Sequence, residues 1–217
     1  AWFETKIAGA LAHRALIFNA PFYRLIHAEA DGLPGVLVDR FGECMVVQPN
    51  AAWAEAHLSL IVEALVSVTG ATTVIKNASG RTRKLEGLDE TREVLRGSLP
   101  DATLRVPMNG AVYLADLTDG QKTGLFFDQC PNHAFAARLS KGARVLDVFS
   151  HVGGFGLAAL AADAEHVTCV DGSASALSLA QESAKIMGRS KSFTPQRGDA
   201  FEVLTVLGEE GAEFDVV

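Results

Sequence analysis

Three acidic residues stand at the predicted ends of successive strands in the second half of the chain. Asp147 lies near the end of an apolar run, Asp171 ends a second such run, and Asp199 follows a third predicted strand over residues 193–197. A predicted helix comes after each run, and strand–helix–strand units of this kind form parallel sheets whose ligands lie at the carboxyl ends of the strands. The three carboxylates are therefore candidates for binding the hydroxyl, amino or cationic groups of one ligand.

A glycine-rich turn follows the first of these strands. Residues 153–156 read Gly-Gly-Phe-Gly, and an Ala/Leu-rich predicted helix follows them. Glycine lets a ligand approach the backbone closely, and a helix N-terminus offers free N–H groups and a partial positive charge. The glycine order differs from the G-x-G-x-x-G fingerprint of nicotinamide-cofactor sites. The alternative interpretation is a plain strand–helix turn in some other α/β protein.

The position of Asp147 favours a cationic ligand over a pyrophosphate, because a carboxylate beside the turn repels phosphate groups. S-adenosylmethionine (SAM) has an amino group, a sulfonium and no phosphate, so it fits better than a dinucleotide. Asp171 is expected to bind ribose hydroxyls, as an acid at the end of a second strand does. Asp199 is expected to accept a hydrogen bond from an adenine amino group. The alternative for each acid alone is a helix N-cap or a surface carboxylate.

The elements that position these residues indicate an α/β chain of two parts. Residues 1–119 read as a small α+β module, and residues 120–217 as part of a Rossmann-like domain with a mainly parallel sheet. The module is expected to contain a helix over 2–18, a strand over 23–29, a hairpin over 36–48, a helix over 52–69, a strand over 73–76, a loop-rich stretch over 77–103 and a hairpin over 104–115.

The composition is that of a globular protein. Hydrophobic residues make up 48% of the 217 residues and charged residues 21%, and no apolar run is long enough to span a membrane. Cys44, Cys130 and Cys169 are widely spaced and odd in number. This pattern predicts reduced thiols in a cytoplasmic protein, with no disulfide framework and no metal site.

Basic residues gather in the first module although the net charge of the chain is −7. A negative chain is not a general nucleic-acid binder, but a local group of cations can contact phosphates. The candidate RNA-binding residues are Lys76, Arg81, Arg83 and Lys84, with Arg92 and Arg96 nearby. The alternative interpretation is a solvated loop.

The segment that joins the two parts reads Gly-Gln-Lys-Thr-Gly-Leu-Phe-Phe-Asp-Gln over residues 120–129. Its glycines allow tight turns, and its polar groups come just before the predicted nucleotide-type domain. We expect this segment to fold over the cofactor pocket as a lid. A simple linker is the alternative, although paired phenylalanines are unusual in one.

Together these stretches resemble the SAM-dependent large-subunit rRNA methyltransferases, which combine a PUA domain, a small α+β (EEHEE-type) module and a class I Rossmann-like methylase domain. That group includes 23S rRNA cytosine carbon-5 methyltransferases. The resemblance covers nearly the whole chain and rests on residues 29–40, 84–88, 120–129, 149–155, 170–177 and 214–217. Residues 29–35 and 122–129 are specific to the group, whereas the glycine loop alone indicates only a methyltransferase.

The resemblance implies a SAM site. Asp147 and the loop over 150–154 would hold the methionine end of SAM, and Phe201 or Ala200 would contact the adenine edge. The chain departs from the group's pattern at Cys130, His151, Val152 and Ser183, where arginine, tyrosine, threonine and asparagine are common. The implied cofactor-binding residues are Thr123, Phe127, Asp128, Gln129, Asp147, Phe149, Ser150, Gly153, Gly154, Asp171, Gly172, Asp199, Ala200 and Phe201.

The resemblance also implies that the chain is a fragment. A PUA domain would precede Ala1, and an Asp-Pro-Pro-type motif and the cysteine nucleophile of carbon-5 chemistry would follow Val217. No catalytic residue is expected within the chain, and the chain alone is expected to be inactive.

The implied function is SAM-dependent methylation of a base in large-subunit rRNA, with cytosine carbon 5 favoured. The expected partner is rRNA, with no membrane and no metal, and a homodimer is left open. Three alternatives remain: a methyltransferase acting on a small molecule or protein, a catalytically silent RNA-binding module with the same fold, and a nicotinamide dehydrogenase.

Overall fold

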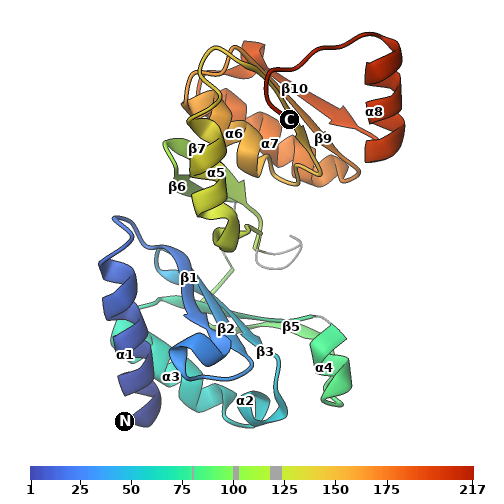
Figure 1. Ribbon diagram of the computed structural model, residues 1–217. Coiled ribbons are helices and arrows are strands. Elements are labelled where there is room, and N and C mark those ends of the chain that lie inside the picture. The colour runs from blue at the N-terminus through green and yellow to red at the C-terminus, as the bar shows by residue number, and fades with distance from the viewer. Residues whose placement is uncertain (80, 100–102, 118–123) are drawn as a thin grey trace. The chain divides into compact units, whose positions relative to one another are not determined.

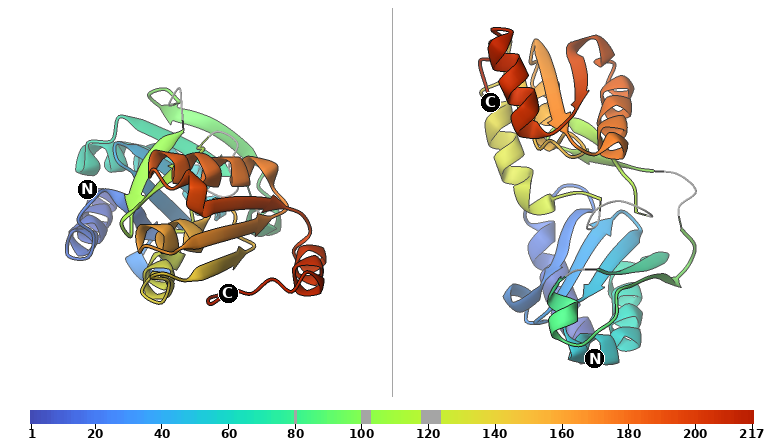
Figure 2. Two further views of the ribbon diagram at one scale, coloured as in Figure 1. Left: turned by 90° about the horizontal axis from the view of Figure 1, so that it is seen from above. Right: turned by 90° about the vertical axis from the view of Figure 1, so that its right-hand side faces the viewer.

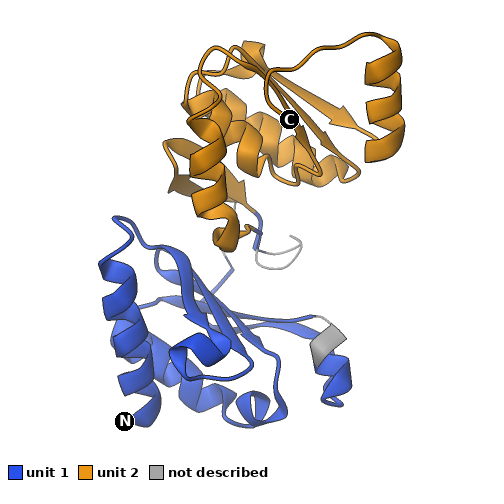
Figure 3. Ribbon diagram, in the orientation of Figure 1, with its two compact units in different colours: residues 1–102, 116–124 blue, residues 103–115, 125–217 orange. Residues whose placement is uncertain are grey.

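The structure, a computed structural model, describes residues 1–79, 81–99, 103–117 and 124–217, without the side chains of Arg81 and Thr82. The chain forms two compact units (Figure 3). Unit 1 comprises residues 1–102 and 116–124, and unit 2 comprises residues 103–115 and 125–217.

Unit 1 is built on a five-stranded sheet (Figure 1). In spatial order the strands are β1 (Phe22–His27), β2 (Val36–Phe41), β3 (Cys44–Pro49), β4 (Thr73–Ala78) and β5 (Thr91–Arg96). Neighbouring strands are antiparallel except β3 and β4, which are parallel. The parallel pair requires a crossover, which α2 (Ala52–Ala56) and α3 (Leu58–Thr69) supply.

Helices α1 (Trp2–Ala15) and α3 pack against each other and contribute to the core of unit 1. Leu58, Ile61 and Leu65 are buried along α3. They recur every three or four residues, which places them on one face of the helix. Unit 1 also contains a 3-10 turn at Ala28–Asp31 and the short helix α4 (Arg81–Leu85).

Unit 1 differs from the sequence prediction in two places. The helix predicted over 52–69 is two helices, because His57 leaves helical geometry at φ −110° and ψ 15°. The stretch predicted as loop over 77–103 contains α4 and β5. Strand β5 gives little sequence signal because it lies at the edge of the sheet with five of its six residues exposed, so no alternating apolar face is needed.

Unit 2 is built on the parallel strands β8 (Arg144–Val148), β9 (His166–Asp171) and β10 (Phe193–Arg197), in the order β10-β9-β8. Val216 forms a parallel bridge with Val145 of β8, as expected for the start of a fourth strand. Helices α5 (Cys130–Ala137), α6 (Gly154–Ala161), α7 (Ala174–Ile186) and α8 (Ala200–Glu209) alternate with the strands, and a 3-10 turn at Ser190–Ser192 precedes β10.

Helices cover both faces of this sheet (Figure 2). Leu146, Val170 and Val203 form one cluster, which places α8 on the face where Leu146 and Val170 point. Val167 and Cys169 point to the other face, where α6 approaches closely at Gly156. Strands covered on both faces read as largely apolar runs, and this pattern predicted β8 and β9.

The hairpin of β6 (Leu104–Met108) and β7 (Ala111–Ala115) belongs to unit 2. The sequence prediction placed it in the module of residues 1–119, since its turn dipeptide Asn109-Gly110 marks a hairpin without indicating which element the hairpin packs against. The amide of Leu114 donates to Ser183 Oγ of α7 at 3.1 Å. The predicted boundary at residues 119–120 lies outside the described residues and stays a prediction.

Candidate functional site

The carboxyl ends of β8 and β9 meet through Asp171 of β9. Its Oδ2 accepts the backbone N–H of His151 at 2.8 Å, and its Oδ1 accepts the N–H of Ser173 at 2.8 Å. Each carboxylate oxygen can accept more than one hydrogen bond, so both retain capacity for a ligand hydroxyl. The carboxylate is thereby held in one orientation beside the loop that follows β8.

The loop after β8 has an unusual backbone. Phe149 and His151 adopt positive φ values of 59° and 50°, and Gly153 adopts 77°. Such conformations strain residues other than glycine and cluster at functional sites. The loop is pinned at Ser150, whose N–H donates to the carbonyl of Val170 at 3.0 Å and whose carbonyl accepts from Gly153 N at 2.8 Å.

Asp147 is buried beneath the loop, at 6% exposure. Its Oδ2 accepts the N–H of Gly156 in the first turn of α6 at 2.8 Å, a favourable place for a carboxylate. Burial nevertheless raises the pKa of Asp147 to about 6, against the lowering effect of the Gly156 hydrogen bond. The same oxygen accepts from Cys169 Sγ of β9 at 3.8 Å. The role of Asp147 toward the methionine end of SAM stays a prediction.

The raised pKa of Asp147 predicts a pH-dependent stability of unit 2. The folded state favours the protonated carboxyl, so this stabilisation is full below the unfolded value of 3.8 and is lost as the pH rises through about 6. Asp147→Asn cannot ionise, and its stability relative to wild type is expected to increase from pH 4.5 to 7.5. Calorimetric unfolding at several pH values measures this difference, with Glu182→Gln on the exposed face of α7 as the control. A difference that does not change with pH would contradict the prediction.

Asp199 caps α8. Its Oδ1 accepts the N–H groups of Phe201 at 2.9 Å and Glu202 at 3.2 Å. This is the N-cap role named as the alternative for each acid, and it leaves Oδ2 for a second partner. Ala200 is buried behind the cap, while Phe201 is 72% exposed.

Two exposed phenylalanines lie together at this edge. The rings of Phe149 (69% exposed) and Phe201 meet edge to face, with centroids 6.2 Å apart. Two adjacent exposed rings form an apolar surface that is open to a ligand. Gly172 is also exposed here, and its carbonyl accepts from Arg197 Nε at 3.3 Å.

The joining segment is only partly described. Thr123 lies outside the described residues. Phe127 is buried in a 3-10 turn at Phe127–Gln129, Asp128 is exposed, and Gln129 Oε1 accepts from Asn132 Nδ2 at 2.9 Å. These contacts neither test nor exclude a lid.

Two site-supporting residues gave no signal in the sequence: Tyr113 of β7 and His133 of α5. Tyr113 Oη donates to the carbonyl of Gly154 at 2.9 Å, and the ring of His133 meets that of Phe155 edge to face at 4.5 Å. A hairpin tyrosine and a helix histidine have no spacing relation to the glycine turn, so only the fold brings them together.

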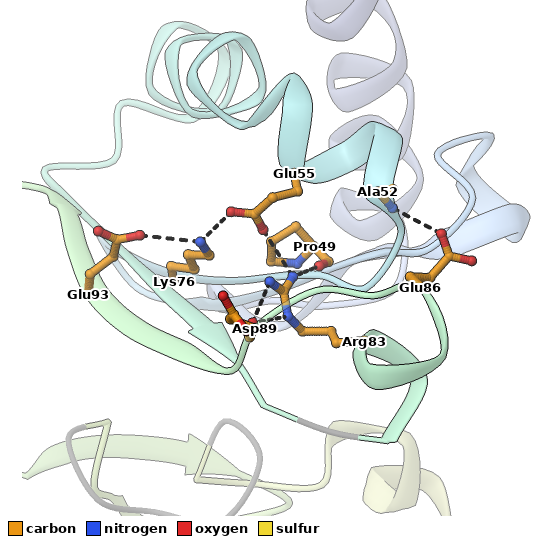
Figure 4. Close-up of polar contacts among 8 residues, drawn as sticks. All are labelled: Pro49, Ala52, Glu55, Lys76, Arg83, Glu86, Asp89 and Glu93. Carbon is orange, nitrogen blue, oxygen red and sulfur yellow. Dashed lines mark hydrogen bonds and ion pairs between the residues drawn. The ribbon is translucent and has the colours of Figure 1, made fainter.

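The candidate RNA-binding residues of unit 1 divide into buried and exposed groups. Lys76 is 4% exposed and Arg83 is 1% exposed. Lys76 Nζ pairs with Glu55 at 2.5 Å and Glu93 at 3.3 Å, while Arg83 Nη1 pairs with Glu55 at 2.9 Å (Figure 4). Arg83 also donates to the carbonyls of Pro49 and Asp89. Neither cation is available to a phosphate as placed, which corrects the prediction for these two residues.

Lys84 remains exposed and pairs with Glu90 at 3.2 Å, while the side chain of Arg81 lies outside the described part of the chain. Arg92 and Arg96 are exposed on β5. The group of exposed cations in unit 1 is therefore smaller than the sequence predicts, because Lys76 and Arg83 are buried.

The three thiols are poorly suited to act as nucleophiles. Burial raises the pKa of Cys44 to about 11, raises that of Cys169 well above its usual value, and also raises that of Cys130. The reactive form of cysteine is the thiolate. Among the described residues, no group of three or more His, Cys, Asp or Glu side chains is placed to hold a metal ion. Within the same residues, no helix is long and apolar enough to cross a membrane.

Known proteins resemble both units. The family model described as Conserved hypothetical protein 95 matches residues 123–217. Ribosomal RNA large subunit methyltransferase I of Aeromonas hydrophila is 39% identical over 197 residues, which are 90% of this chain and 50% of that protein. The protein of the same name from Klebsiella pneumoniae is 35% identical over 221 residues, covering 100% of this chain and 55% of that protein. The chain thus spans about half the length of these relatives.

Solved structures share the arrangement of the elements. A candidate SAM-dependent methyltransferase from Streptococcus mutans gives a TM-score of 0.86 at 20% identity, covering 99% of this chain and 57% of that one. A second structure with a TM-score of 0.86, at 20% identity and covering 99% of this chain and 56% of that one, is a candidate methyltransferase complexed with SAH. The chain therefore has the Rossmann-like α/β fold of SAM-dependent methyltransferases, as its sequence predicts.

Proposed function

We propose that the protein containing this chain is a SAM-dependent methyltransferase that modifies a base of large-subunit rRNA, with cytosine carbon 5 favoured. The observation that carries the proposal is the hydrogen bond between Asp171 and the loop after β8. It joins a strand-end carboxylate to a glycine turn in the fold of SAM-dependent methyltransferases. The names of the curated relatives support rRNA as the substrate.

The residues at the strand ends fit the chemistry of SAM. Asp171 keeps lone pairs for two ribose hydroxyls, Asp199 keeps one oxygen for an adenine amino group, and exposed Phe149 and Phe201 offer apolar surface to an aromatic ring. Ser150, Gly153 and Gly154 belong to the turn where the methionine end would lie. Gly172 directly follows Asp171 in the chain, and Ala200 directly follows Asp199. Bound SAM supplies an electrophilic methyl group on its sulfonium, while these residues bind and orient it.

We also propose that Thr123, Phe127, Asp128 and Gln129 close over the cofactor. The RNA contact is proposed at Arg81 and Lys84, without Lys76 and Arg83. The high pKa values of the three cysteines support the view that none of them is the nucleophile of carbon-5 chemistry. A cytoplasmic location accords with an rRNA substrate and free thiols, and a homodimer stays a prediction.

Titration of SAM into the chain by calorimetry tests the cofactor site. Asp171→Ala removes the proposed acceptor of two ribose hydroxyls, and we expect SAM binding to weaken by on the order of 1–3 kcal/mol, which is roughly 5- to 150-fold. Glu182→Ala in the same unit removes an exposed carboxylate paired only with Lys185 in the described contacts, and it should leave SAM binding unchanged.

The alternatives give different results. A folded sample that binds no SAM, both as this chain and within a longer protein that contains it, would favour the silent RNA-binding module. NADH binding in place of SAM would favour a dehydrogenase. SAM binding followed by methyl transfer to a small molecule or protein, and none to large-subunit rRNA, would contradict the proposed substrate.

A further inference from the structure

A buried tyrosine lies behind the glycine turn. Tyr113 of β7 is 0% exposed, and its hydroxyl donates to the carbonyl of Gly154 at 2.9 Å. Burial raises the pKa of Tyr113 well above its usual value, so the hydroxyl keeps its proton near neutral pH and acts as a donor. The hydroxyl therefore fixes the first residue of α6 from the side of the hairpin.

A buried histidine approaches the same glycine from helix α5. His133 is 5% exposed, meets the ring of Phe155 at 4.5 Å and lies nearly parallel to the ring of Tyr113 at 6.5 Å. A Cβ added to Gly154 would lie 2.7 Å from His133 Nε2, closer than real Cβ contacts allow. The backbone of Gly154 is compatible with alanine, because it is not among the residues with positive φ. The space at Gly154 is thus limited by the histidine ring and not by the turn.

His133 acts here through its shape. Burial lowers its pKa to about 4, so the ring is neutral near pH 7. Its Nδ1 is buried and has no hydrogen-bond partner among the described residues. The neutral ring therefore acts on Gly154 through the space that it fills, which alanine would leave empty.

Both supports are themselves anchored within unit 2. At the hairpin tip, Asn109 Nδ2 donates to the carbonyl of Cys130 at the start of α5 at 2.9 Å. On the other side of β7, Leu114 N donates to Ser183 Oγ of α7. The hairpin and α5 therefore form one braced support beneath the turn.

We propose that Tyr113 and His133 are positioning residues that hold Gly154 and thereby set the geometry of the turn that takes the methionine end of SAM. Naming SAM as the ligand rests on the proposed function, whereas the bracing of Gly154 does not. Adenosine lacks the methionine end, so its binding should not depend on the brace.

The first test replaces each of the two tyrosines of the chain. Tyr113→Phe removes only the hydroxyl, and we expect SAM affinity to fall about 5- to 10-fold with adenosine affinity changed less than about 2-fold. The matched control is Tyr23→Phe, which removes a hydroxyl that accepts from Arg40 Nη1 at 3.2 Å in unit 1 and should change neither affinity. Equal weakening of SAM and adenosine, or no weakening of either, would overturn the proposal.

Amide hydrogen exchange of residues 150–156 in the ligand-free protein gives a readout that does not need SAM. Exchange there should be faster in Tyr113→Phe than in wild type, and unchanged exchange overturns the bracing. If wild type binds neither SAM nor adenosine but the exchange rises as expected, the proposed function fails while the bracing stands.

The second test is a size exchange between His133 and Gly154. Gly154→Ala alone should weaken SAM binding by about 10-fold or more, because the new methyl group displaces the ring or the turn. In the His133→Ala background the same change should cost less than about 2-fold, since the space is then free. An equal penalty for Gly154→Ala in both backgrounds would show that the histidine does not set this position.

Discussion

Glu55→Ala is expected to destabilise unit 1 by about 3–5 kcal/mol, because it removes the carboxylate that two buried cations share. Glu55 Oε1 and Oε2 each hold one of them, Lys76 at 2.5 Å and Arg83 at 2.9 Å, and the side chains of these cations are only 5% and 2% exposed. Burial alone would raise the pKa of Glu55, but hydrogen bonds from Lys76 and Arg83 outweigh it and lower the pKa.

Urea unfolding followed by tryptophan fluorescence measures this loss for unit 1 alone, because Trp2 and Trp53 are the two tryptophans of the chain and both lie in that unit. The matched control is Glu90→Ala, which breaks the exposed pair with Lys84 and should cost about 0–1 kcal/mol. A loss at Glu55 no larger than at Glu90 would contradict the burial of the two cations.

The lowered pKa of Glu55 also sets the sign of the pH dependence. Its stabilising contribution is present above the unfolded value of 4.5 and is lost as the pH falls through the lower folded value. Glu55→Ala should therefore differ most from wild type near neutral pH and least in acid. This behaviour is opposite to that expected for Asp147 in unit 2.

The same pair of cations shows what sequence reasoning could not reach. Lys76 and Arg83 belong to a run of basic residues, and a run of this kind reads as a phosphate-binding surface. Their partner Glu55 lies on α2, 21 and 28 positions away in the chain. No local pattern links these positions, so only the ion pairs of Glu55 in the folded structure show that the charges are already neutralised.

The strand-end acids of unit 2 were predictable for the opposite reason. Strands β8 and β9 are mostly buried and therefore read as apolar runs. An acidic residue at the end of such a run is easily recognised in the sequence. Asp171 and Asp199 also follow the rule that carboxylates lie near helix N-termini. The sequence does not show which oxygens of Asp171 accept backbone N–H groups. This depends on the conformation of the loop at Phe149 and His151.

The hairpin of residues 104–115 could be predicted only in part. Its turn dipeptide fixed its structure, but its packing partner was invisible because Tyr113 and Leu114 are ordinary strand residues. The contacts of these residues with Gly154 and Ser183 are long-range in sequence. The support of the glycine turn is therefore the part of the candidate site that needed the structure.

Gly156→Ala is expected to destabilise unit 2 by about 1–3 kcal/mol and to weaken SAM binding as a consequence. A Cβ at Gly156 would lie 2.6 Å from Cys169 Sγ, 2.8 Å from Val167 Cγ1 and 3.3 Å from Asp147 Oδ2, all on the buried face of the sheet. Strand atoms in a packed core cannot move aside cheaply. Helix α6 would have to move away, which lengthens the 2.8 Å hydrogen bond from Gly156 N to Asp147 and shifts the turn before it.

The matched control is a glycine in a helix of the same unit with the opposite expected sign. Gly208 of α8 is exposed, and a Cβ there would meet nothing within 4 Å. Gly208→Ala should therefore stabilise unit 2 by about 0.5–1 kcal/mol through helix propensity alone. Calorimetric unfolding measures both variants, and tryptophan fluorescence of unit 1 should change in neither. A stabilising effect at both positions would contradict the close approach of α6 to the sheet at Gly156, and with it the geometry of the turn that is proposed to bind SAM.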